Sequence, residues 1–166
     1  MPARQSAVAL LLALLLAWLP CLAGGQAGAG ETDGQIDRPV FETATLLLDR
    51  DDGTTLTYRV ELATTPQQHA YGLMHRPRLA PDAGMLFVFK GMAVRQFWMK
   101  NTLIPLDMLF FDAEGRFVSA VRQAAPGSLV PRRSDGPAKY VLELNGGRME
   151  ADGIDAGTRL RLPVGR

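Results

Sequence analysis

The chain has 166 residues, of which 47% are hydrophobic and 21% are charged, and its formal net charge is +1. This length and composition are ordinary for one globular domain once a targeting segment is removed. Acidic and basic residues are interspersed, and no known nucleic-acid motif occurs. We therefore expect no nucleic-acid partner.

The N-terminal residues have the layout of a secretory signal peptide. Arg4 precedes a Leu/Ala-rich run from Ala7 to Trp18, and a small-residue region follows. We predict a signal peptide over residues 1–23, with cleavage after Ala23 or as late as Ala29, and a periplasmic or extracellular destination. The alternative is an uncleaved anchor, but the run is short for a bilayer span of about 20 residues. The mature chain should therefore contain no stable membrane span.

Cys21 is the only cysteine in the chain. Pro20 directly precedes it, where lipoprotein processing requires a small residue, so acylation at Cys21 is disfavoured. Cleavage beyond Cys21 leaves a mature domain with neither a disulfide nor a thiol nucleophile. Residues 24–39 are rich in Gly, Ala and acidic side chains, which predicts a flexible leader. A single domain is then expected over residues 40–166.

Short β-forming runs separated by turn residues dominate this domain. Asp51-Asp52-Gly53 and Asp112-Ala113-Glu114-Gly115 each separate two such runs and predict hairpins. Thr65 followed by Pro66 is typical of a helix start. The predicted strands cover residues 43–48, 55–62, 84–89, 97–101, 106–111, 116–122, 139–144 and 158–162, and the helical segments cover residues 67–74 and 147–152.

Many short strands with one or two short helices indicate a mainly β fold, a β-rich α+β domain built as a compact small β-barrel. The Pro/Gly/Ser-containing segment from Ala124 to Gly136 is predicted to be a surface loop beside a site.

The stretch from Trp98 to Asp107 concentrates unlike side chains around a proline. If it is extended, Trp98 and Lys100 point to one side and Met99 and Asn101 to the other. Pro105 fits a bend or a strand entrance, so a new strand should begin at residue 106. The stretch is the strongest candidate for a site.

Four separate motifs give the chain a resemblance to a known family. They are Gly72-Leu73-Met74-His75-Arg76, Gly84-Met85-Leu86-Phe87, Trp98-Met99-Lys100-Asn101-Thr102-Leu103-Ile104-Pro105-Leu106-Asp107, and Val141-Leu142-Glu143-Leu144 followed by Gly146-Gly147. In this order, over about residues 43–162, they resemble the domain-of-unknown-function family number 192. The resemblance implies a small β-barrel-like domain, commonly exported, and assigns no catalytic residue.

The candidate ligand-binding residues share a position in or beside these motifs. They are Arg76, Trp98, Lys100, Asn101, Asp107 and Glu143. Trp98 offers a flat face for stacking a sugar, and Arg76 could clamp an anion or serve as an internal brace. Asp107 and Glu143 are candidate acid and base, or structural carboxylates that cap a turn or pair with Arg76 or Lys100.

These residues favour an exported, non-catalytic and monomeric binding module without a cofactor. Its partner is expected to be a small ligand, such as a glycan fragment, or an envelope protein. A cell-envelope hydrolase using Asp107 and Glu143 is the first alternative. A periplasmic copper-binding protein is the second, because the methionines together with His69 and His75 are soft ligands, although Met also fills irregular cores. No defensible Ser-His-Asp set and no phosphate-binding loop occurs.

Overall fold

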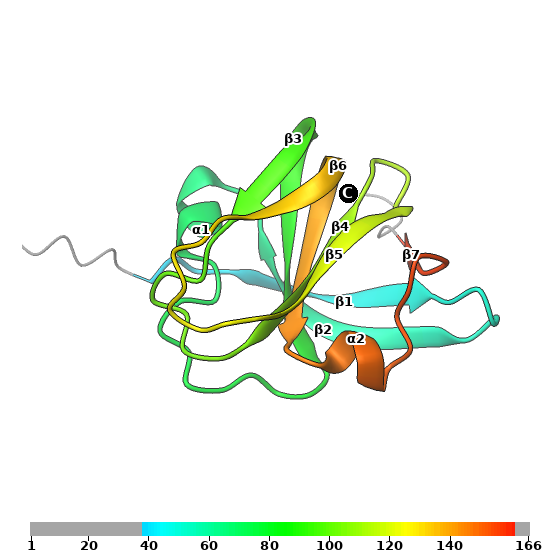
Figure 1. Ribbon diagram of the computed structural model, residues 1–166, viewed down its shortest axis with the longest axis horizontal. Coiled ribbons are helices and arrows are strands. Elements are labelled where there is room, and N and C mark those ends of the chain that lie inside the picture. Colours follow the sequence, from blue (N-terminus) through cyan, green and yellow to red (C-terminus); the bar gives the residue numbers. More distant parts are fainter. Residues whose placement is uncertain (1–37, 162–166) are drawn as a thin grey trace, which may run out of the picture. The chain divides into compact units, whose positions relative to one another are not determined.

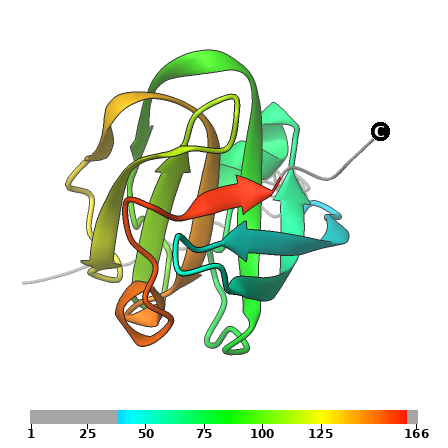
Figure 2. The same ribbon diagram turned by 90° about the vertical axis from the view of Figure 1, so that its right-hand side faces the viewer.

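A computed structural model describes residues 38–161, which form one seven-stranded sheet in the order β5-β4-β6-β3-β2-β1-β7. Its strands are β1 (Glu42–Asp49), β2 (Thr55–Ala63), β3 (Ala83–Phe97), β4 (Leu106–Phe111), β5 (Phe117–Ala124), β6 (Arg132–Asn145) and β7 (Arg159–Arg161), and its helices are α1 (Pro66–Tyr71) and α2 (Arg148–Ala151). The sheet curls into a half-barrel (Figures 1 and 2). The mainly β fold predicted from the sequence is thereby confirmed.

The predicted signal peptide, and all of the predicted leader except residues 38 and 39, lie outside the described residues. Within residues 38–161, no helix is long and apolar enough to cross a bilayer.

Both predicted hairpins form, and each turns on a glycine in the left-handed region. Gly53 (φ 83°) joins β1 to its antiparallel partner β2, and Gly115 (φ 76°) joins β4 to β5. Strand β3 is not joined to β2 by a hairpin, because β2 and β3 are parallel. A parallel pair needs a crossover connection, and α1 lies in that connection.

Helix α1 starts where the sequence predicted but ends earlier. The Thr65 side chain accepts a hydrogen bond from the Gln68 backbone N–H, and the Gln68 side chain accepts one from the Thr65 N–H, which is a capping box. The helix stops at Gly72 (φ 51°), where a Cβ would lie 3.3 Å from the Phe87 ring. The predicted continuation through residue 74 is therefore wrong.

The predicted strand over residues 97–101 is also wrong, because β3 is one continuous strand that ends at Phe97. The chain then turns: the Thr102 N–H donates to the Met99 carbonyl at 3.0 Å, and Asn101 has φ 56°. A turn of this kind removes the period-two alternation expected for these side chains. Met99 is buried whereas Trp98 is 53% exposed.

Strand β6 begins at Arg132, inside the segment predicted as a surface loop. The loop prediction rests on the Pro/Gly/Ser content of residues 124–136. Pro137 follows them directly, and proline normally disfavours a central strand. Here Pro137 lies opposite Val94, between two register shifts in the β3–β6 pairing. The bulged pairing accommodates the proline, so the loop is limited to residues 125–131.

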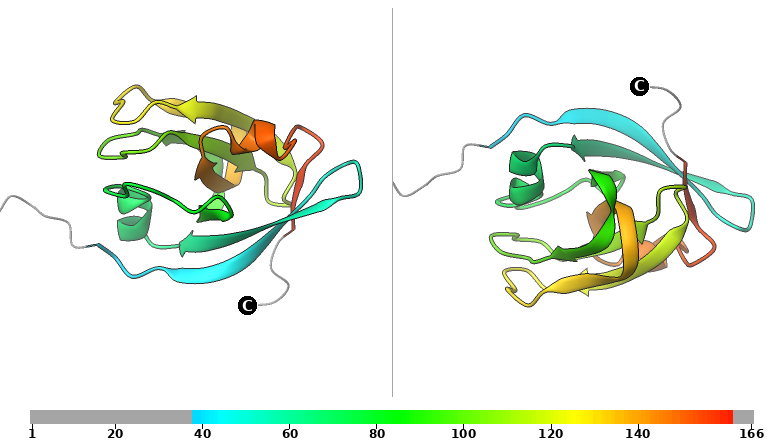
Figure 3. Two further views of the ribbon diagram at one scale, coloured as in Figure 1. Left: turned by 90° about the horizontal axis from the view of Figure 1, so that it is seen from below. Right: turned by 90° about the horizontal axis from the view of Figure 1, so that it is seen from above.

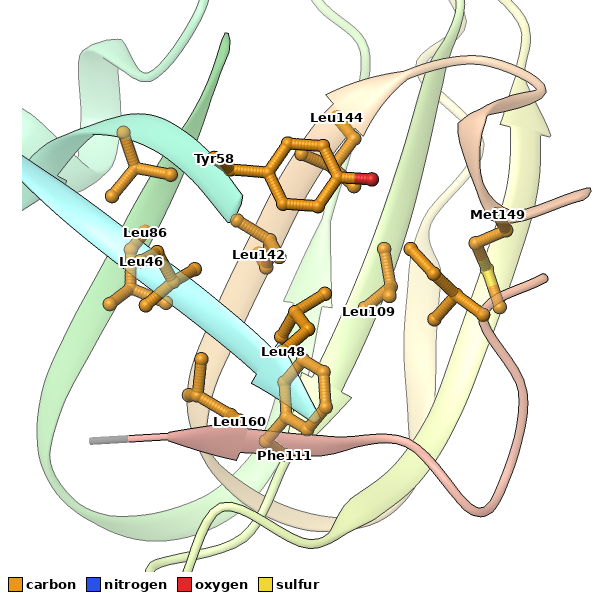
Figure 4. Packing of buried hydrophobic residues seen from close by; sticks show 12 residues of the cluster. Leu46, Leu48, Tyr58, Leu86, Leu109, Phe111, Leu142, Leu144, Met149 and Leu160 are labelled. Carbon is orange, nitrogen blue, oxygen red and sulfur yellow. The ribbon is translucent and has the colours of Figure 1, made fainter. Parts of the chain in front are cut away.

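Two hydrophobic clusters lie on opposite faces of the central strands. The first, which we call the barrel core, fills the concave side of the half-barrel and includes Leu48, Tyr58, Leu109, Phe111 and Leu142 (Figure 4). The second core includes Met85, Phe87, Met99, Met108, Phe110 and Val141. Strand β4 separates them and is buried along its whole length. Its near-continuous apolar sequence follows from having a core on both faces.

Candidate ligand pocket

A cavity of about 220 Å³ lies beside the second core, between α1, β3 and the turn that follows β3. Six of its lining residues are aromatic, namely His69, Tyr71, Phe87, Phe89, Phe97 and Trp98. Polar groups reach it from Gln96, Thr102 and Glu143. An apolar cavity with a few polar groups is the usual form of a small-molecule site.

The aromatic walls are held by ring contacts that do not depend on a ligand. Phe87 and Phe97 meet edge to face with centroids 5.0 Å apart, and His69 lies 4.4 Å from Phe89. The His69 Nε2 is 2.9 Å from the Ala63 carbonyl oxygen. A carbonyl can only accept, so Nε2 carries a proton and the ring is fixed in orientation.

Glu143 is the polar residue of the cavity whose burial has no evident structural role. It is only 4% exposed, and no hydrogen bond or ion pair joins its carboxyl group to any residue in the described range 38–161. Its cross-strand neighbours are Met85 on β3 and Met108 on β4, both fully buried. Burial in this apolar setting raises the pKa of Glu143 from 4.5 to about 8. At neutral pH the group is mostly protonated and can donate a hydrogen bond.

Asp107 lies on the other side of the sheet. In the β4–β6 pairing Asp107 is opposite Leu144, whereas Glu143 is opposite Met108, so the two carboxyl groups face opposite cores. Asp107 is fully buried and accepts backbone hydrogen bonds from Gln123 at 2.7 Å and Met149 at 2.8 Å. The structure therefore does not bring together the two carboxylates that the hydrolase hypothesis requires.

Arg76 is engaged in an internal brace. Its guanidinium donates to both carboxylate oxygens of Glu61, at 2.7 and 2.5 Å, and the two side chains are 16% and 20% exposed. A bidentate pair of this kind uses the guanidinium N–H donors that would otherwise bind an anion. Of the two roles that the sequence left open for Arg76, the geometry matches the brace.

Lys100 and Asn101 lie in the turn after β3 and are exposed. The Lys100 Nζ is 5.6 Å from the centroid of the Trp98 ring, and the Asn101 carbonyl accepts a hydrogen bond from the His75 N–H. Neither lines the aromatic cavity. Of the six candidate residues, the structure brings Trp98 and Glu143 together there.

The methionines and histidines of the copper hypothesis are only partly brought together. Met85, Met99 and Met108 are fully buried in the second core, and His69 and Met74 line the adjoining cavity, whereas Met92 is exposed on β3. Within residues 38–161, no group of three His, Cys, Asp or Glu side chains could hold a metal ion.

Sequence reasoning missed the aromatic wall, although a signal for it was present. Phe87 and Phe89 are two positions apart in one strand, and period-two geometry places such residues on one face, whereas Phe97 lies beyond the register shifts of β3 and its side is not given by this pattern. The helix contribution, His69 and Tyr71, depends on the packing of α1 against β3, which the sequence does not show.

These features define a curled β half-barrel with a small aromatic cavity on its second core. The family DUF192, described as "Uncharacterized ACR", matches residues 47–162, and the chain belongs to this family. The resemblance seen in the sequence is thereby confirmed.

Two solved structures are similar to the chain. One, described as a putative transcription regulator from Sinorhizobium meliloti 1021, is 40% identical with a TM-score of 0.73, over 75% of this chain and 96% of that chain. The other, a protein of unknown function from Novosphingobium aromaticivorans DSM 12444, is 30% identical with a TM-score of 0.70, over 80% of this chain and 100% of that chain. No curated protein matches the chain.

Proposed function

We propose that the domain is an exported binding module that takes a small, uncharged polar ligand into the aromatic cavity, with a glycan fragment as the leading candidate. The observation that carries this proposal is Glu143, a carboxyl group only 4% exposed that lines the cavity and has no hydrogen-bond or ion-pair partner among residues 38–161. Leaving such a group unpaired costs folding free energy, and proteins retain that cost at functional sites.

The charges around the cavity disfavour a cationic ligand. The Arg95 guanidinium lies 3.8 Å from the centroid of the Phe89 ring, and Lys100 lies beside Trp98. Cations of the chain itself therefore already occupy positions over two of the aromatic rings, which disfavours a cationic ligand. Glu143 is mostly protonated at neutral pH, so it offers a hydrogen-bond donor rather than a negative charge.

A sugar ring matches this combination of groups. Its apolar face stacks on an exposed tryptophan, and its hydroxyl groups accept from a carboxylic acid and pair with Thr102 or Gln96. The cavity of about 220 Å³ suits one ring rather than an extended polymer inside it. The predicted signal peptide is consistent with a ligand of the cell envelope.

A thermal-shift screen with neutral monosaccharides and N-acetylated amino sugars tests the proposal. A ligand that binds the folded state raises Tm. We expect Glu143→Leu and Trp98→Ala to abolish that rise, whereas Glu143→Gln keeps a donor and retains binding. In the wild type the rise should shrink above pH 8 as Glu143 ionises, and in Glu143→Gln it should not.

Glu114→Gln is the matched control, because Glu114 is exposed in the β4–β5 turn and does not line the cavity. Binding that survives both Glu143→Leu and Trp98→Ala would rule out this cavity as the site.

A further inference from the structure

Two loops next to the cavity expose large apolar side chains to solvent. Trp98 is 53% exposed, Leu103 57%, Leu129 63% and Val130 61%. We call these four residues the apolar rim. Only the first of them lines the aromatic cavity, so the other three need a separate explanation. Isolated exposed apolar side chains are common, but a contiguous group marks an interaction surface.

The two loops that carry the rim lie side by side because backbone hydrogen bonds join them. The Met99 N–H donates to the Ser128 carbonyl at 2.8 Å, and the Gly127 N–H donates to the Thr102 carbonyl at 3.0 Å. Trp98 and Pro131 line a common groove. Both loops lie at the same end of the sheet as α1 (Figure 3). The exposure is therefore fixed by the fold.

The charged side chains next to the rim are mostly cations. Lys100 lies in the first loop, and Arg132 and Arg133 are the first two residues of β6 directly after the second loop, while Asp135, two residues further along β6, is an exposed acid. Lys100 and Arg133 are exposed, and Arg132 is half-buried with its guanidinium on the Val130 carbonyl. Tryptophan and aliphatic side chains flanked by cations are typical of segments that enter the interfacial region of anionic membranes.

We propose that the apolar rim docks on an anionic lipid surface, with Leu103, Leu129 and Val130 inserted among the acyl chains and Trp98 at headgroup level. Lys100, Arg132 and Arg133 then lie against the lipid phosphates. A lipid surface accounts for both observations, since the apolar side chains lose contact with water while the cations meet negative charge. A second copy of the chain would instead bring equal positive charges together.

Fluorescence of Trp98 tests this directly. Trp18 lies in the predicted signal peptide, so the mature chain that begins at residue 24 has Trp98 as its only indole. Phosphatidylglycerol vesicles should shift its emission to the blue and protect it from acrylamide, and phosphatidylcholine vesicles should do so much less. The predicted leader is present in every variant, so differences between variants report on the rim.

In this mature chain Leu129→Ser should weaken partitioning roughly tenfold and Arg133→Ala roughly fivefold. Both side chains are exposed, so neither variant should lose the fold, which circular dichroism can verify. Met92→Ser is the matched control, because Met92 is 47% exposed on β3 but lies outside the two loops. It should partition like its parent.

Three results would overturn the proposal. They are an emission unchanged by phosphatidylglycerol vesicles, a partition equally strong in Leu129→Ser, and a Trp98 response to duplex DNA or to self-association that exceeds the response to vesicles. Leu129 and Arg133 do not line the aromatic cavity, so these results leave the ligand proposal standing.

Discussion

Asp107 and Glu143 are buried carboxyl groups on neighbouring strands, yet their surroundings are opposite. Asp107 faces the barrel core and accepts two backbone N–H groups. Glu143 faces the second core and lines a cavity, and no residue in the part of the chain that the structure describes pairs with its carboxyl group. A buried carboxylate whose oxygens accept hydrogen bonds stabilises the fold, whereas a buried carboxyl group without partners destabilises it. Burial alone therefore does not identify a functional carboxylate, and the hydrogen-bond partners distinguish a structural group from a functional one.

The largest expected effect comes from removing the satisfied carboxylate. Asp107→Ala leaves the backbone N–H groups of Gln123 and Met149 without their acceptor, and we expect a loss of about 3–4 kcal/mol in the free energy of unfolding. Equilibrium urea unfolding should show a lower midpoint at an unchanged slope. Asp135→Ala is the control, because Asp135 is exposed on β6. An unchanged midpoint in Asp107→Ala would remove the structural role.

The unsatisfied carboxyl should behave in the opposite way. Because the folded-state pKa of Glu143 is about 8 and its ordinary value is 4.5, between these pH values the unfolded chain is ionised while the native chain keeps its proton. Stability contributed by this group is present below about pH 4.5 and is lost as pH rises to about 8. We expect Glu143→Gln to raise the free energy of unfolding by about 2–3 kcal/mol at pH 9 and to change it little at pH 4.5. Urea unfolding at each pH measures this difference. A difference in the free energy of unfolding between the two proteins that stays constant from pH 4.5 to pH 9 would contradict the prediction.

The close approach of β3 to β6 sets the position of Glu143. A Cβ on Gly84 would lie 2.6 Å from the Glu143 carbonyl oxygen, so Gly84→Ala must separate the strands and should cost about 2 kcal/mol. Gly91→Ala is the matched control, since nothing lies within 4 Å of its Cβ. Thermal unfolding of the two variants should differ clearly, and equal Tm values would show that the strands adapt without cost.

The smallest expected effect on stability is that of Trp98→Ala. Because its side chain is about half exposed, we expect a change below about 1 kcal/mol in the free energy of unfolding. Ligand binding should nevertheless be lost. A large drop in the urea midpoint would show that Trp98 stabilises the fold, as Asp107 does, and that its role is not limited to contacting a ligand.

The sequence predicted the turns and the helix start that are determined by neighbouring residues in the chain. Gly53 and Gly115 marked the two hairpins, and Thr65-Pro66 marked the start of α1. It failed where distant contacts decide, since the turn after Phe97 depends on the Ser128 carbonyl and the extension of β6 on its bulged pairing with β3.

The candidate site was predictable only in part for the same reason. Trp98 and Glu143 were named from their motifs, but nothing local tells the face of Glu143 from that of Asp107. That distinction depends on the register between β4 and β6, which a one-residue shift would reverse. The contribution of α1 to the cavity likewise depends on the parallel β2–β3 crossover.

The pairing of β1 with β7 affects the order in which the domain can form (Figure 2). Arg161 donates to the Asp49 carboxylate 112 residues away. Strand β1 is therefore synthesised first among the seven strands but can pair with β7, its outer neighbour, only after β7 has been synthesised. Contacts of such long sequence separation form slowly because a large loop must close. Until then the outer edge of β1 has unpaired backbone groups that another chain can extend. Chains that lose their C-terminal strand should therefore be prone to aggregation through β1, even though β7 has only three residues.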